Sequence, residues 1–216
     1  MCGIAGLFDR TGKRDFSPQL IKAMTDSIAH RGPDGDGFYH DVGVAFGHRR
    51  LSIIDLSGGH QPMSLFDESV TVTFNGEIYN FKELRAQLEA AGAKFRTNSD
   101  TESLLHGWRI WGPDFVTRLR GMFAFALWDR EKQTLFLARD RLGKKPLHYA
   151  VLPDGTLAFA SEIKAILQYP EIDRTLDNHA VRLPQAAHGE RRAGEFGGLA
   201  QNTRAESLAL VAAGNG

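Results

Sequence analysis

The chain of 216 residues is long enough for one large domain, or for one domain with an appendage, because single domains commonly hold about 100 to 200 residues. Its 26 basic and 26 acidic residues cancel, so composition gives no electrostatic reason to expect nucleic acid or an anionic membrane as partner. A small, roughly neutral substrate fits this balance better.

Three further features of the sequence narrow the class of protein. The longest apolar run, Gly121 to Trp128, falls far short of the ~20 residues that a membrane-spanning helix needs. The chain does not open with the basic segment, apolar core and cleavage site of a secretory signal, so a cytoplasmic location is expected. Cys2 is the single cysteine, which excludes an internal disulfide or a cysteine-built zinc site.

The first half of the chain alternates short apolar runs with glycine-rich turns. Runs of β-forming residues predict strands at Ile4 to Phe8, Val42 to Phe46 and Val70 to Phe74. Apolar residues at helical spacing predict helices over Pro18 to Ala29, before the breaker-rich sequence HRGPDGDG, and over Phe81 to Ala91, before Gly92.

The second half predicts one more helix and a group of strands. Ser99 and Glu102 have the spacing of an S-x-x-E capping box, which predicts a helix from Thr101 to about Trp111. Strands are predicted at Met122 to Trp128, Thr134 to Arg139, Leu147 to Leu152 and Leu157 to Ser161. Many strands with a few interposed helices predict an α+β fold, with sheets packed against each other and helices outside.

The composition changes near Asn178. From there to Gly216 the chain is rich in Ala, Gly and Arg, lacks lysine, and contains one aromatic residue, Phe196, and one short apolar stretch, Leu208 to Ala212. We therefore expect a folded domain over residues 2–177 and a divergent, mostly disordered tail over residues 178–216.

Cys2 directly follows the initiator methionine. Removal of Met1 would leave Cys2 with a free α-amine, whose ordinary pKa of ~7.7 to 8.0 lets it act as general base toward the neighbouring thiol. This arrangement needs a cysteine at position 2, and it predicts a nucleophile. The alternative is that Cys2 is a small buried apolar residue.

Two other segments suggest groups that could serve such a nucleophile. Asn75 and Gly76 follow a predicted strand, where an Asn-Gly pair is typical of a hairpin turn. The alternative is that the side-chain amide of Asn75 and the backbone N–H of Gly76 converge on a developing oxyanion. Arg50 and Asp100 could bind the carboxylate and the ammonium of an amino acid, or could be a surface cation and a helix cap.

Eight segments together resemble a known family. They are MCGIAGLF at the start, HRGPDGDG (30–37), GHRRLSIID (47–55), FNGEIYN (74–80), NSDTE (98–102), GMFAFALWD (121–129), ARDRLGKKPLHY (138–149) and ASEIKAI (160–166). Over residues 1 to about 177 the chain resembles class II glutamine amidotransferases, and most of all the N-terminal domain of asparagine synthase. Eight matches in order make coincidence implausible.

The resemblance implies an N-terminal-nucleophile hydrolase fold, a four-layer αββα sandwich. It implies that Cys2 attacks the side-chain amide of L-glutamine and that ammonia leaves as a glutamyl thioester forms. Asn75 and Gly76 would form the oxyanion hole. The residues implied to bind the substrate are Arg50, with Leu51, Ser52, Ile53 and Ile54 on the same strand, together with Asn75, Gly76, Glu77 and Asp100.

The chain departs from the family where a synthetase domain would follow. Ser57, Gly58 and Gly59 echo a pyrophosphate loop but lack the Asp-Ser that should come next. We therefore expect no cofactor in this chain, with ATP and Mg belonging to a missing synthetase domain, and we interpret the chain as truncated. A separate synthetase chain could receive the ammonia.

Other polar residues give weaker signals. His30, His48 and His148 do not have metal-ligand spacing within one short element, so structural roles and no metal site are expected. Lys144 and Lys145 fit a solvated turn better than an anion site. A non-catalytic glutamine-binding or interaction module is the alternative to an enzyme, but such a module would not require Cys2.

Overall fold

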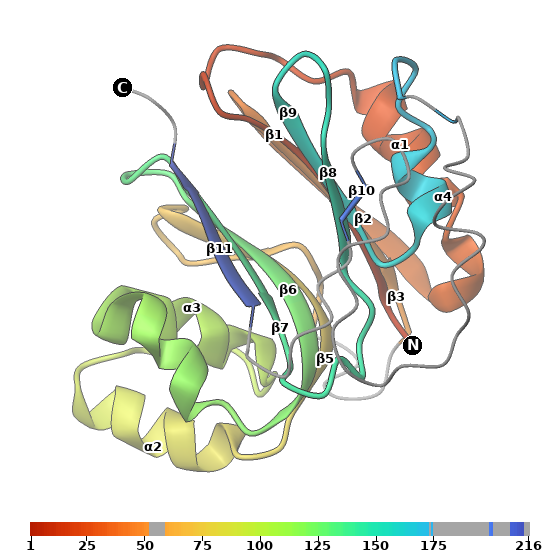
Figure 1. Cartoon of the computed structure of the whole chain (residues 1–216). Helices are drawn as coiled ribbons and strands as arrows, with labels where there is room; N and C mark the ends of the chain where they lie inside the picture. Colours follow the sequence, from red (N-terminus) through yellow and green to blue (C-terminus); the bar gives the residue numbers. More distant parts are fainter. Residues whose placement is uncertain (52–58, 173, 175–198, 201–207, 214–216) are drawn as a thin grey trace.

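The computed structural model describes residues 1–51, 59–172, 174, 199–200 and 208–213. Two antiparallel sheets face each other, and helices cover the outer face of each sheet (Figure 1). The four layers therefore run helix, sheet, sheet, helix. This arrangement confirms the predicted α+β sandwich.

The first sheet has six strands in the order β10-β8-β9-β1-β3-β2. These strands are β1 (Gly3–Asp9), β2 (Gly35–Asp41), β3 (Val44–Arg50), β8 (His148–Val151), β9 (Thr156–Ala160) and β10 (Leu199–Ala200). Strand β1 lies between β3 and β9, and all seven of its residues are buried. The chain therefore begins at the centre of a sheet, which fixes the position of Cys2 immediately before Gly3.

The second sheet has five strands in the order β11-β7-β6-β5-β4. These strands are β4 (Met63–Ser64), β5 (Val70–Ile78), β6 (Gly121–Asp129), β7 (Thr134–Arg139) and β11 (Leu208–Ala213). The long strands β5 and β6 pair antiparallel along their full length, from Val70 opposite Asp129 to Ile78 opposite Gly121.

The helices lie in two pairs. Helices α1 (Pro18–Asp26) and α4 (Ile163–Ile166) cover the six-stranded sheet, whereas α2 (Phe81–Ala90) and α3 (Thr101–Trp111) cover the five-stranded sheet (Figure 1). Short 3-10 turns occur at Ala29–Arg31 and Gly112–Arg118. Helix α1 starts as its sequence predicts, because Pro18 occupies the first turn and the Ser17 side chain accepts a hydrogen bond from the backbone of Gln19.

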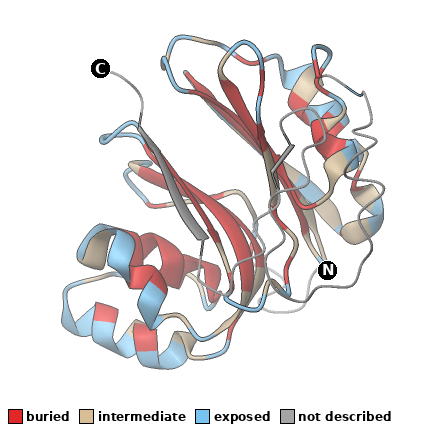
Figure 2. Ribbon diagram, in the orientation of Figure 1, coloured by how far each residue is buried: buried red, intermediate tan, exposed pale blue. Residues whose placement is uncertain are grey.

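Buried residues line both faces of each sheet, and Figure 2 shows them gathered between the layers. Between the sheets, large apolar side chains interdigitate, including Phe8, Phe46, Trp128 and Phe159. Phe46 meets Phe159 edge to face with ring centroids 5.8 Å apart. This dry centre holds the two sheets together and leaves the start of β1 near one end of the sandwich.

Most predicted elements are present, and several of them have shifted ends. The strand predicted at Val42 to Phe46 begins two residues later, because Gly43 has φ +81 and forms the turn between β2 and β3. Strand β2 starts inside the HRGPDGDG segment, which the sequence predicts to be a loop. The two-residue strand β4 has no counterpart in the prediction.

The predicted capping box is wrong, although the helix it marks runs from Thr101 to Trp111 as expected. The Glu102 carboxylate does not reach back to Ser99. It accepts hydrogen bonds from the backbone N–H groups of Arg96 (2.9 Å) and Thr97 (2.8 Å), so it organises the loop before the helix instead.

Most of the predicted disordered tail lies outside the described residues. Two of its segments are strands: β10 pairs with β8, and β11 pairs with β7. The apolar stretch Leu208 to Ala212 thus belongs to a strand. No helix in the described part of the chain is long and apolar enough to cross a membrane.

Candidate functional site

The thiol of Cys2 lies beside the end of strand β3. Leu51, directly after β3, donates its backbone N–H toward Cys2 Sγ across 3.4 Å, and the Leu51 carbonyl oxygen is 3.5 Å from the same sulfur. The antiparallel register of β1 and β3, with Gly3 opposite Arg49, produces this contact. A backbone N–H that points at the sulfur can donate a hydrogen bond to negative charge that forms there during a reaction.

A charged network holds the backbone of Cys2. Arg31 Nε donates a hydrogen bond to the main-chain oxygen of Cys2 (3.0 Å), and Arg31 Nη1 pairs with Glu162 Oε1 (2.9 Å). His30 and Lys164 also contact the Glu162 carboxylate, at 2.9 Å and 3.2 Å. Burial alone would raise the pKa of Glu162, but hydrogen bonds from Arg31, Lys164 and His30 outweigh it and hold that pKa at about 2.

A cavity of about 90 Å³ opens beside Cys2. Its lining includes every residue that the sequence predicts for the site and that the structure describes, namely Cys2, Arg50, Leu51, Asn75, Gly76, Glu77 and Asp100. The predicted residues Ser52, Ile53 and Ile54 lie outside the described residues. Side chains from both sheets and from the start of α3 thus meet at one end of the sandwich.

Asn75 and Gly76 lie inside strand β5, opposite Ala124 and Phe123 of β6, so their interpretation as a hairpin turn is wrong. The Asn75 side chain is buried, and its Nδ2 has no hydrogen-bond partner among the described residues. Leaving such a donor unpaired costs about 1 to 3 kcal/mol. The amide is therefore ready to donate to an oxygen atom that enters the cavity.

Gly76 is required by close packing of the backbone. A Cβ at this position would lie 2.3 Å from the carbonyl oxygen of Met122 and 2.7 Å from Cα of Phe123. A larger residue would push β5 away from β6 and move the neighbouring Asn75. The Asn-Gly pair is therefore a strand feature that places the Asn75 side-chain donor beside the backbone N–H of Gly76.

Asp100 places a buried carboxylate on the far side of the cavity. Its Oδ2 accepts a hydrogen bond from the backbone N–H of Ile78 (2.9 Å), and its side chain precedes the first turn of α3. Burial raises the pKa of Asp100, and the nearby charge of Glu77 adds to that rise, whereas the backbone hydrogen bonds oppose it. A cation bound here would stabilise the ionised form.

Gln61 and Lys145 are among the lining residues that the sequence does not assign to the site. Gln61 accepts a hydrogen bond from the backbone N–H of Phe74 at 2.6 Å, and no motif in the sequence marks it. Lys145 is 6% exposed and lines the cavity. The predicted solvated turn therefore describes Lys144, which is exposed, but is wrong for Lys145. The residue in the sequence that came closest to indicating this ordered turn is Asp140, whose carboxylate accepts hydrogen bonds from the backbone N–H groups of both lysines.

The predicted structural histidines are in three different settings. His48 is fully buried between the sheets, where burial and then the charge of Arg50 lower its pKa to about 3. Burial also lowers the pKa of His148, whereas His30 pairs with Glu162 near the surface. Within the described part of the chain, no three His, Cys, Asp or Glu side chains converge to hold a metal ion.

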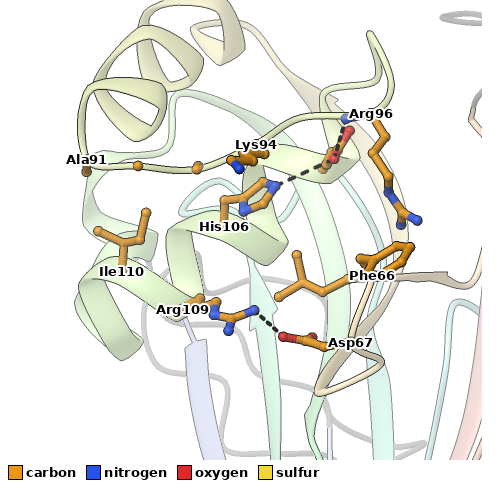
Figure 3. A pocket seen from close by; sticks show the side chains of 12 residues that line it. Phe66, Asp67, Ala91, Lys94, Arg96, His106, Arg109 and Ile110 are labelled. Carbon is orange, nitrogen blue, oxygen red and sulfur yellow. Dashed lines mark hydrogen bonds and ion pairs between the residues drawn. The ribbon is translucent and has the colours of Figure 1, made fainter.

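A larger hollow of about 490 Å³ lies against α2 and α3 (Figure 3). Several of its charged side chains are engaged with each other or with the backbone. Arg109 pairs with Asp67 at 2.5 Å, and Glu102 accepts hydrogen bonds from the backbone of the Arg96 loop. No thiol or hydroxyl side chain of the described residues lines it. The smaller cavity beside Cys2 is therefore the candidate active site.

Comparison with known proteins identifies the family of the chain. The family model described as "Glutamine amidotransferase domain" matches residues 1–193, beyond the predicted boundary at 177. The chain is 46% identical over 184 residues to asparagine synthetase [glutamine-hydrolyzing] 1 of Bacillus subtilis, covering 84% of this chain and 29% of that protein. It is 43% identical over 213 residues to a putative asparagine synthetase [glutamine-hydrolyzing] of Mycobacterium tuberculosis, covering 88% of this chain and 32% of that protein.

The fold also has a solved counterpart. Glutamine phosphoribosylpyrophosphate amidotransferase from B. subtilis superposes with a TM-score of 0.63 at 24% identity, over 76% of this chain and 43% of that chain. The chain spans less than a third of the length of the two curated relatives, so it corresponds to one part of them. The family match covers most of the chain, and this chain belongs to the family of glutamine amidotransferase domains.

Proposed function

We propose that the chain hydrolyses L-glutamine to glutamate and ammonia, with Cys2 as the nucleophile after removal of Met1. The observation that carries this proposal is that one cavity contains the Cys2 thiol, the buried carboxylate of Asp100 and the amide of Asn75, which has no hydrogen-bond partner in the described part of the chain. These are the three chemical groups that a glutamine amide hydrolase needs. A non-catalytic binding module would need neither the thiol nor the oxyanion donor.

The reaction begins with the α-amine of Cys2, which takes the thiol proton because its ordinary pKa of ~7.7 to 8.0 lies near neutrality. The thiolate attacks the side-chain amide carbon, and the amide oxygen becomes an oxyanion that Asn75 Nδ2 and the Gly76 N–H stabilise. The protonated α-amine then donates its proton to the departing nitrogen. Ammonia leaves, and a glutamyl thioester remains on Cys2.

Water completes the cycle. The α-amine takes a proton from the water as its oxygen attacks the thioester, and glutamate leaves as the sulfur regains a proton. The Leu51 N–H, 3.4 Å from Sγ, stabilises the thiolate both before attack and when it leaves.

Charge complementarity supports the proposed binding mode for glutamine. Arg50 takes the α-carboxylate, as guanidinium groups commonly do, and Leu51 lines the same cavity directly after it. Ser52, Ile53 and Ile54 are proposed as further substrate-binding residues from the family resemblance alone. Asp100, with help from Glu77, takes the α-ammonium. Asn75 and Gly76 contact the amide at the other end of the substrate.

We also propose that the released ammonia is used by a synthetase. The named relatives are glutamine-hydrolysing asparagine synthetases, which supports delivery of ammonia to a synthetase site in the same polypeptide or in a separate chain. ATP and Mg belong to that synthetase part, and we propose that residues 2–177 form the catalytic unit in a cytoplasmic location. The 216-residue chain alone should form no asparagine from aspartate, ATP and glutamine.

The decisive experiment measures glutamate release by the purified chain beside the Cys2→Ala variant, with the N-terminal mass recorded on the same sample. We expect turnover only in the chain whose first residue is Cys2. Turnover that persists in Cys2→Ala would exclude Cys2 as nucleophile. A processed and folded chain that releases no glutamate would contradict the proposal and favour the binding module.

A further inference from the structure

Gln61 connects the two ends of the candidate glutamine site. Its side-chain Oε1 accepts a hydrogen bond from the backbone N–H of Phe74 at 2.6 Å, and its Nε2 lies 3.5 Å from the hydroxyl of Thr101. Phe74 directly precedes the oxyanion donor Asn75, and Thr101 directly follows the carboxylate of Asp100. One side chain therefore contacts both neighbours of the groups that bind opposite ends of the substrate.

Strand register explains why a side chain is needed at this point. Strand β4 pairs Met63 with Val72 of β5, so two further residues of ladder would place Gln61 opposite Phe74. The strand stops at Met63, however, and the backbone N–H of Phe74 would lose its partner. The Gln61 amide oxygen supplies the missing acceptor, which keeps this part of β5 in its pleated conformation.

The backbone of Gln61 is itself held tightly. Gly37 of strand β2 packs so closely that a Cβ there would lie 2.0 Å from the Gln61 carbonyl oxygen. The residue is thus in contact with the six-stranded sheet through β2, with the five-stranded sheet through β5, and with helix α3 through Thr101.

We propose that Gln61 is a positioning residue that sets the distance between the oxyanion donors and the ammonium site, and that it thereby selects glutamine over asparagine. This inference rests on the proposed function. Asparagine is one methylene shorter, so it can reach only one of the two sites when their separation is fixed. One methylene is worth about 10- to 200-fold in discrimination by a rigid site.

The test compares binding of glutamine and asparagine by calorimetry in a Cys2→Ala background, where no turnover interferes. Gln61→Met keeps the length of the side chain but removes both polar contacts. We expect glutamine to bind about tenfold more weakly and asparagine to change little, so that the preference for glutamine narrows. Gln168→Ala, which removes an exposed glutamine bonded to the Lys164 carbonyl, is the control and should change neither affinity.

Thr101→Val tests the same link from the helix side and leaves the Phe74 contact intact. We expect this variant also to narrow the preference for glutamine over asparagine. The double variant should lose no more glutamine affinity than Gln61→Met alone, because both substitutions remove the contact between Gln61 and Thr101. An unchanged preference in either folded variant, or an equal loss for both amino acids, would overturn the inference. If Gln61→Met does not fold, Thr101→Val decides.

The proposed glutamine hydrolysis can be refuted independently of the positioning role of Gln61. Absence of glutamate release by the chain with an intact Cys2, together with glutamine binding that depends on Gln61, would refute hydrolysis and keep the positioning role. Absence of glutamine binding in the Cys2→Ala chain would overturn both.

Discussion

Arg31 donates a hydrogen bond from Nε to the main-chain oxygen of Cys2 across 3.0 Å, although the two residues are 29 positions apart. The guanidinium is itself fixed by Glu162, so the first residues of β1 are tied to the segment that follows β9. The hydrogen bond between Ile4 N and Ser161 Oγ (3.0 Å) strengthens this link. A nucleophile at a chain terminus would otherwise be free to move, because termini are poorly ordered unless tied down.

Replacing Arg31 should therefore slow catalysis. We expect Arg31→Met to lower kcat for glutamate release by about 10- to 100-fold, since small displacements of reacting groups cost that much. Arg130→Met removes an exposed guanidinium that pairs with Asp41 and should leave kcat unchanged. Steady-state kinetics check both, and equal kcat values for the two variants would show that the Arg31 contact does not position Cys2.

Removing the amide of Asn75 should affect the chemical step. We expect Asn75→Ala to lower kcat by about 100- to 1,000-fold, as for other lost oxyanion donors, with a much smaller change in KM. Its free energy of unfolding should change little, because Nδ2 has no protein partner to lose among the described residues. Urea unfolding and kinetics on the same preparation check this, and a large destabilisation with intact kcat would assign Asn75 a structural role.

The raised pKa of Asp100 gives a pH dependence with a defined sign. Because its folded pKa lies above the ordinary value of 3.8, the folded chain binds a proton that the unfolded chain has lost, and stability falls as pH rises from that value through the folded pKa. Asp100→Asn should abolish that fall in unfolding experiments without glutamine. In the wild type, the KM for glutamine should rise on acidification through the same pKa, because a protonated carboxyl cannot pair with an ammonium.

Glu162 should give a pH dependence of folding stability with the opposite sign, and so serves as an internal control. Its pKa is lowered from 4.5 to about 2, so its stabilising contribution is present above pH 4.5 and is lost as pH falls toward about 2. Glu162→Gln should remove this acid dependence in the same unfolding experiments. Identical pH profiles for wild type and Glu162→Gln would contradict the network described around Cys2.

Lys144 and Lys145 form a natural matched pair. Lys145 is buried against the cavity, where its ammonium adds positive potential that favours a thiolate and a substrate carboxylate, whereas Lys144 is exposed. We expect Lys145→Met to lower kcat/KM for glutamine by about tenfold, equal to about 1.4 kcal/mol, and Lys144→Met to have little effect. Equal values for the two variants would exclude an electrostatic role for Lys145.

Local sequence signals were sufficient where one element decided the outcome. The S-x-x-E spacing predicted helix α3 from Thr101 to about Trp111, although its capping box does not form, and a run of β-forming residues predicted strand β7 at Thr134–Arg139 with its observed ends. Resemblance to a family grouped Cys2, Asn75 and Asp100 before any geometry was known, and the structure brings them to one cavity.

What sequence could not predict depends on contacts between distant segments. Gln61 acquires its role only because β4 stops short opposite Phe74, and Lys145 is buried only because its turn folds over the cavity. Asn75 and Gly76 look like a turn in isolation, but pairing with β6 makes them strand residues. Each of these outcomes depends on tertiary contacts, which a single sequence does not display.

Strand β11 limits how far the chain can be shortened without exposing the edge of a sheet. Its six residues pair with β7 from Leu208 opposite Arg139 to Ala213 opposite Thr134, and so cover the whole outer side of that strand. A protein shortened at residue 177 would keep every group of the cavity but would leave β7 as a bare edge, with a row of unsatisfied N–H and C=O groups. Bare edges recruit strands from other molecules. Such a shortened protein should therefore self-associate. Strand β11, which contributes no residue to the cavity, would then protect the full chain from aggregation.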